Sequence, residues 1–97
     1  MRRLEEILPI ERPRILDLAR KHGARNVRVF GSAGRGDSKA QSDLDLLVEM
    51  EKGRSLLDRV ALSQDLEDLL GHKVDVVNEK ALHWFVRDRI LAEATAL

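Results

Sequence analysis

The stretch from Val27 to Val48 constrains the fold of this chain more than any other segment. It reads as an apolar strand, a Gly-Ser turn, a glycine-rich basic loop and a second strand that opens with Asp43-Leu44-Asp45. Side chains alternate along a strand, so we expect Asp43 and Asp45 on one face, roughly 6–7 Å apart at their Cα atoms. Aspartate is disfavoured in strands, so the pair indicates a bound ligand, with solvent-facing charges at a strand's start as the alternative.

The loop between these two strands has the chemistry of a phosphate-binding segment. Gly31 and Ser32 offer backbone N–H groups and a hydroxyl, and Arg35 adds positive charge, which are the groups that phosphates bind. Asp43 and Asp45 offer the oxygen ligands that Mg²⁺ prefers, and Mg²⁺ usually shares its shell with substrate phosphates. The alternatives are that Ser32 caps a helix and that Arg35 is simply solvated.

Helix and strand signals on either side of this stretch predict one small α/β (α+β) domain. Pro13 suits the first turn of a helix, and Ser55 with Asp58 resembles a capping box. Residues 1–12 form either a short helix broken at Pro9 or a loosely tied arm. The expected architecture is a small mixed β-sheet with helices packed mainly on one face. We expect helices over residues 13–22, 55–70 and 80–94 and strands over 26–30, 43–49 and 73–77.

Apolar periodicity predicts how the two later helices pack. In the helix over 55–70 the leucines recur at helical spacing and should cover the sheet, with Leu56 and Val60 extending their face. In the last helix Phe85 lies on one apolar face and Trp84 on nearly the opposite one. A helix that is apolar on two sides indicates contact with a second chain, although fraying or another arm of the chain would also account for it.

Asp75 is a third acidic residue in a strand. It alternates with Val74 and Val76, so its carboxylate is expected on the face opposite to theirs. That placement fits a border of the Asp43/Asp45 site. It also fits an edge-strand charge that discourages aggregation. The histidines His22, His72 and His83 have no metal-ligand spacing and are interpreted as surface or capping residues.

Composition narrows the class of protein. The 97 residues suit a single domain, residues 1–97, without a separate substrate domain. Seventeen basic and seventeen acidic residues cancel, so no basic field recruits nucleic acid directly. The chain has no cysteine, which fits a cytoplasmic location, and no apolar run approaches a membrane span or signal peptide.

The segments VFGSAGRGD and SDLDLLVE resemble the signature of the nucleotidyltransferase superfamily related to DNA polymerase beta. In that signature Gly-Ser is followed after about ten residues by Asp-x-Asp, as Gly31-Ser32 is followed here by Asp43 and Asp45. The length resembles the minimal nucleotidyltransferases, and the resemblance runs from about Ile15 to the C-terminus. It implies the nucleotidyltransferase fold.

The same resemblance implies the site and its chemistry. Asp43, Asp45 and Asp75 would hold two Mg²⁺ ions, and Asp75 would also accept the proton of the attacking hydroxyl. The implied substrate is ATP, and its triphosphate would bind at Gly31, Ser32 and Arg35.

The resemblance further implies a partner. Minimal members of the superfamily are typically paired with a HEPN-domain toxin in a hetero-oligomeric toxin–antitoxin module. The nucleotidyltransferase is the antitoxin and can transfer AMP from ATP to a tyrosine of the toxin. A hypothesis from another class stays open, in which the chain is a non-catalytic binding module that neutralises or scaffolds its partner by contact.

Overall fold

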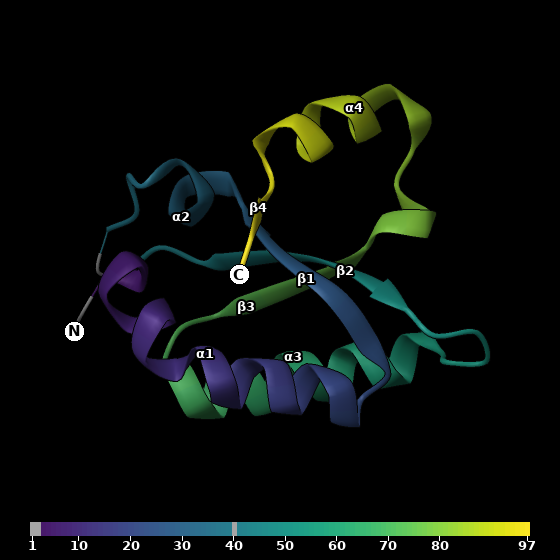
Figure 1. The fold of residues 1–97 in the computed structure, drawn as a ribbon, viewed down its shortest axis with the longest axis horizontal. Helices are drawn as coiled ribbons and strands as arrows, with labels where there is room; N and C mark the ends of the chain where they lie inside the picture. Colours follow the sequence, from purple (N-terminus) through teal and green to yellow (C-terminus); the bar gives the residue numbers. More distant parts are fainter. Residues whose placement is uncertain (1–2, 40) are drawn as a thin grey trace.

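The computed structural model describes residues 3–39 and 41–97, and its centre is a mixed four-stranded sheet (Figure 1). The strand order is β3-β2-β1-β4, with β1 antiparallel to both β2 and β4 and with β2 parallel to β3. In chain order the elements are α1 (Leu4–Lys21), β1 (Ala24–Phe30), α2 (Gly31–Arg35), β2 (Leu44–Met50), α3 (Leu56–Leu70), β3 (Val74–Asn78), the 3-10 helix η1 (Glu79–Ala81), α4 (Trp84–Glu93) and β4 (Thr95–Ala96).

The two long helices, α1 and α3, lie side by side against one face of the sheet, and α4 lies on the other side (Figure 1). The core forms between the two long helices and the strands. Burying one leucine-sized side chain contributes about 1.5–3 kcal/mol, so this layer accounts for most of the fold's stability. The expected small mixed sheet with helices mainly on one face is confirmed. The largest fully buried side chains are those of Leu4, Ile15, Leu44, Leu46, Leu47, Val48, Leu62 and Leu66.

Helix α1 is longer than the expected helix over residues 13–22. It begins at Leu4 and contains both Pro9 and Pro13, so the expected start at residue 13 is wrong. Both alternatives for the preceding segment, a helix broken at Pro9 and a loosely tied arm, are wrong as well. A proline inside a helix costs about 3 kcal/mol. Burial of Leu8 and Ile15, together with Leu4, offsets that cost because all three face the core.

Helix α3 has the expected ends but not the whole expected apolar face. Ser55 caps it and forms the capping box with Asp58, and Gly71 ends it in the left-handed conformation. Leu56 and Val60, however, are 63% and 42% exposed, so their expected packing on the sheet is wrong. The reason is their position beside the open edge of β3, where no further strand covers them.

That open edge of β3 is closed by side chains from α3. The backbone N–H of Val74 donates to Glu67 Oε2 over 3.0 Å, and the Ser63 hydroxyl donates to the carbonyl oxygen of Val74. One turn away, Arg59 donates to the carbonyl oxygen of Val76 over 3.4 Å. These three residues of α3 are spaced by four positions, so they lie in one stripe along the helix. The stripe contacts the outer backbone edge of β3, the edge that faces away from β2.

The C-terminal region differs from the single helix expected over residues 80–94. It forms η1, α4 and the short strand β4, which pairs with β1 and was not expected. His83 caps α4 by accepting a hydrogen bond from the backbone N–H of Phe85, as expected. Trp84 and Phe85, which were expected on two different apolar faces of this helix, are both exposed. None of the helices in the described ranges is long and apolar enough to cross a bilayer.

His72, interpreted from the sequence as a surface or capping residue, is buried. Its Nδ1 lies 3.0 Å from the carbonyl oxygen of Ser42, so the ring packs beneath the segment that leads into β2. His22 is half-buried, and its Nε2 lies 2.6 Å from Asp65 Oδ2. His22 thus joins the end of α1 to α3, and His72 contacts the segment before β2.

Candidate functional site

Three adjacent strands bring the predicted site residues to one part of the sheet. The last residue of β1, Phe30, pairs with Asp45 on β2, so Gly31 follows directly beside Asp45. On the other side of β2, Asp45 pairs with Asp75 on β3. Neighbouring strands lie roughly 4.7–4.9 Å apart, so Asp45 sits between Gly31 and Asp75 at close range. Asp43 immediately precedes β2 rather than lying within it, and the expected strand over 43–49 begins one residue later.

Gly31 and Asp45 approach so closely that the position accepts only glycine without rearrangement. Gly31 has φ +69°, a left-handed conformation that side chains disfavour. A Cβ at this position would lie 2.3 Å from Asp45 Oδ2. The missing side chain therefore leaves the space that the Asp45 carboxylate occupies.

The electrostatics of the site centre on Asp45. Its pKa is raised above the ordinary value of 3.8 chiefly by burial, and the negative charges of Asp75 and Asp43 raise it further. The guanidinium of Arg35 opposes this shift. Repulsion among three carboxylates with one nearby cation marks a place where a cation would be stabilised. Asp43 and Asp75 themselves are exposed to solvent.

The expected glycine-rich loop begins as the short helix α2. Ser32 lies inside α2, and the capping position is Phe30, so the alternative in which Ser32 is an N-cap is wrong. Arg35, at the last turn of α2, is half-exposed. Its Nε lies 3.5 Å from Asp37 Oδ2, and its Nη1 lies 3.8 Å from Glu93 Oε2 on α4. Arg35 is thus near Asp45 and shared between two carboxylates.

The three aspartates have the donor chemistry for Mg²⁺ but do not form a closed ligand set. Within residues 3–39 and 41–97, no three Asp, Glu, His or Cys side chains are grouped closely enough to hold a metal ion by themselves. Mg²⁺ is usually bound through one or two carboxylates, with water and substrate phosphates completing its shell. The raised pKa of Asp45 is consistent with that role, because a bound cation would relieve the repulsion from its neighbours. The donor set therefore fits Mg²⁺ together with a phosphate ligand.

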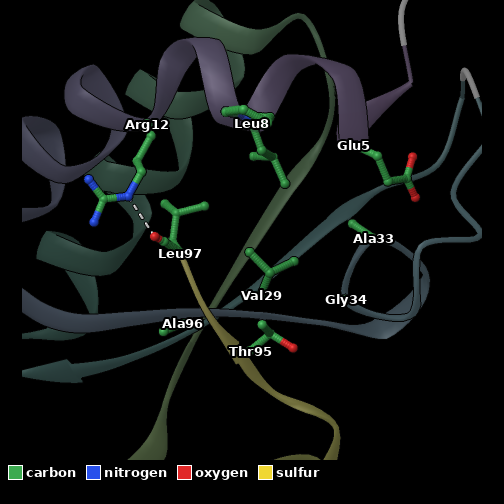
Figure 2. A pocket seen from close by; sticks show the side chains of 10 residues that line it. Glu5, Leu8, Arg12, Val29, Ala33, Gly34, Thr95, Ala96 and Leu97 are labelled. Carbon is green, nitrogen blue, oxygen red and sulfur yellow. Dashed lines mark hydrogen bonds between the residues drawn. The ribbon is translucent and has the colours of Figure 1, made fainter.

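The sequence did not predict the hollows in the described part of the chain, and two of them border elements of the candidate site. The larger, about 330 Å³, lies between α1, β1, α2 and β4, where Arg12 donates to the carbonyl oxygen of Leu97 over 2.7 Å (Figure 2). None of the three aspartates lines it. The smaller, about 160 Å³, lies between α3 and β3 and includes Asp75 in its lining. Neither hollow has a motif, because each is lined by residues of more than one helix or strand.

The family of the chain follows from its motif, its fold and its relatives. The sequence profile of the nucleotidyltransferase domain family matches residues 14–97, and the chain belongs to this family. A Methanocaldococcus jannaschii protein, MJ0435, is provisionally named a protein adenylyltransferase and is 44% identical over 84% of this chain and 87% of its own length. Protein adenylyltransferase MntA of Thermococcus cleftensis is 40% identical over 93% of this chain and 91% of its own.

Solved structures agree with this assignment. One, provisionally named a minimal nucleotidyltransferase, superposes with a TM-score of 0.86 and 48% identity over 96% of this chain and 95% of its own. A Shewanella oneidensis MNT antitoxin in complex with tri-AMPylated HEPN toxin gives a TM-score of 0.70 at 19% identity, over 91% of this chain and 69% of that one. At that identity the likeness shows the fold alone. The chain is a nucleotidyltransferase of the minimal type.

Proposed function

We propose that this chain is a Mg²⁺-dependent protein adenylyltransferase that moves AMP from ATP to a tyrosine hydroxyl of a HEPN-type toxin and thereby acts as its antitoxin. The observation that carries the proposal is the position of Asp45, held against Gly31 on one side and opposite Asp75 on the other. Relatives at 40% and 44% identity bear the name protein adenylyltransferase. The HEPN partner is drawn from the complexes that share the fold.

The proposed roles follow the order of the strands. Gly31 and Ser32 position the triphosphate of ATP, and Arg35 neutralises part of its charge. Asp43, Asp45 and Asp75 would hold two Mg²⁺ ions, which when bound would offset phosphate charge and favour ionisation of the acceptor hydroxyl. The protein thereby contributes mainly placement and electrostatic stabilisation, which dominate catalysis of phosphoryl-type transfer.

The transfer balances as a single displacement. The acceptor oxygen attacks the α-phosphorus of ATP and forms a new O–P bond, while the bond from that phosphorus to the β-phosphate's bridging oxygen breaks. Pyrophosphate leaves with the electron pair. The hydroxyl proton passes to the carboxylate of Asp75, which releases it to water. The products are the adenylylated acceptor and pyrophosphate.

Transfer of α-phosphate label tests the proposal. The wild type and an Asp43→Asn/Asp45→Asn variant are each incubated with Mg²⁺, ATP labelled at the α-phosphate, and the product of the adjacent gene, tested as the HEPN-domain acceptor. We expect label on the HEPN protein with the wild type only, and no label from ATP labelled at the γ-phosphate. A stable complex that carries no α-label would contradict catalysis and support a module that neutralises its partner by contact.

A further inference from the structure

Glu93 is held beside the candidate site by the sheet rather than by its own helix. It is the last residue of α4, a helix that the structure describes in full and in which no residue is buried. The chain then enters β4, where Thr95 pairs with Val29 on β1. Because β1 leads from Val29 to Gly31, this pairing places Glu93 next to the start of α2 (Figure 1). The same strand therefore positions both Glu93 and the proposed phosphate-binding segment.

A close backbone contact between α2 and the end of α4 supports this placement. A Cβ on Gly34, inside α2, would lie 3.7 Å from the carbonyl oxygen of Glu93 and 2.9 Å from that of Val29. Real Cβ atoms do not approach closer than 3.0 Å, so the missing side chain at Gly34 lets α2 lie this close to β1. The main chain of Glu93 therefore lies beside α2 independently of its side-chain charge.

The side chain of Glu93 pairs with Arg35, the cation of the candidate site. Its Oε2 lies 3.8 Å from Arg35 Nη1, while Asp37 Oδ2 accepts a hydrogen bond from Arg35 Nε over 3.5 Å. A guanidinium has five N–H donors in one plane, so carboxylates on these two nitrogens orient the plane and leave other donors for a phosphate. Asp37 follows Arg35 in the same segment, whereas Glu93 comes from a different element that β4 fixes. Glu93 thus holds the guanidinium from outside the loop.

We infer that Glu93 is a positioning residue, which keeps the guanidinium of Arg35 aimed at the triphosphate of ATP and away from Asp45. This inference rests on the proposed function. Without Glu93, the remaining carboxylates would draw Arg35 toward them, because Asp45 and Asp37 also attract its charge. Arg35 would then contribute less to the binding of ATP.

The sign of the effect separates positioning from simple charge repulsion. Glu93 and the triphosphate are both negative, so by repulsion alone the loss of the Glu93 charge should strengthen ATP binding. Positioning predicts weaker binding, because Arg35 loses its orientation. The side chains of Arg35 and Glu93 are 52% and 34% exposed, so solvent screens the pair and we expect a change of about threefold.

Glu93→Gln tests the inference, with Arg89→Gln as the matched control. Arg89 is 84% exposed, and its Nε lies 3.9 Å from Glu93 Oε1, so the control removes an ion pair of the same helix and leaves Arg35 unchanged. The ligand is α,β-methylene-ATP with Mg²⁺, which cannot be cleaved at the bond that adenylyl transfer breaks. Its Kd is measured by isothermal titration calorimetry. We expect the Kd to rise about threefold in Glu93→Gln and to stay at the wild-type value in Arg89→Gln.

An Arg35→Gln background shows whether Glu93 acts through Arg35. In that background Glu93→Gln should no longer raise the Kd. Circular dichroism checks that each variant is folded. A Kd that is unchanged or lower in the single Glu93→Gln variant, or that rises equally in both backgrounds, would overturn the inference and leave adenylyl transfer intact. If the Kd values follow the expected pattern but the wild type transfers no α-phosphate label, the inference stands and the proposed function is overturned.

Discussion

Gly31→Ala is the most informative single change, because the added methyl group would clash with the Asp45 carboxylate. The new Cβ would lie 2.3 Å from Asp45 Oδ2, and real Cβ atoms do not approach closer than 3.0 Å, so the carboxylate must move by at least 0.7 Å. A misplacement of about 1 Å in a catalytic group lowers rates about 100-fold. We therefore expect AMP transfer to fall about 100-fold.

The same substitution also carries a backbone penalty that must be separated from the effect on Asp45. An alanine at φ +69° costs about 1–2 kcal/mol, which for a domain of this size lowers Tm by about 4–16 °C. Gly71 has the same φ, and a Cβ there would have no neighbour within 4 Å. Gly71→Ala is thus a control with the backbone penalty and without the displaced carboxylate.

Two measurements on both variants separate the displacement of the Asp45 carboxylate from the backbone penalty. Thermal unfolding by circular dichroism should show similar losses of Tm for Gly31→Ala and Gly71→Ala. Initial rates of α-phosphate transfer, taken well below either Tm, should be low for Gly31→Ala and near wild type for Gly71→Ala. Similar transfer rates for the two variants would refute the reasoning, because the position of Asp45 would then not limit the reaction.

Three further changes test the electrostatics and the packing. Asp45→Asn should abolish transfer yet raise Tm at pH 7 in Mg²⁺-free buffer. The raised pKa of Asp45 means that its ionised carboxylate disfavours the folded state, and asparagine removes that charge. The gain in Tm over the wild type should disappear as pH falls below 3.8, where the carboxyl is protonated in both states. Ser55→Ala removes the cap of α3 and should cost about 1 kcal/mol, seen as a Tm lower by about 4–8 °C with transfer unchanged. Leu66→Ala, at a fully buried position, should cost about 2–5 kcal/mol in urea unfolding.

Local sequence signals predicted the parts of the fold that depend on local chemistry. Ser55 with Asp58 placed the start of α3, and Gly71 placed its end, because capping uses groups only a few residues apart. The alternation around Asp43-Leu44-Asp45 placed β2 to within one residue. For the same reason the residues of the candidate site could be predicted from the sequence, whereas their arrangement in space could not.

What the sequence did not predict depends on distant partners. Helix α1 runs through Pro9 because its leucines meet a core built from later segments. Strand β4 is two residues long and is defined only by its hydrogen-bonded pairing with β1, a segment distant in the sequence. The register that sets Asp45 opposite Asp75 joins positions thirty residues apart, and no local pattern encodes which strand lies beside which.

The closure of the β3 edge by α3 affects how another protein can bind this one. An exposed strand edge invites β-augmentation, in which a partner's extended segment adds a strand through backbone hydrogen bonds. Here Glu67, Ser63 and Arg59 already bond backbone groups of Val74 and Val76. A binding partner on this side must therefore be recognised through its side chains. Recognition of this kind depends on the partner's sequence, whereas strand addition through backbone hydrogen bonds accepts many sequences.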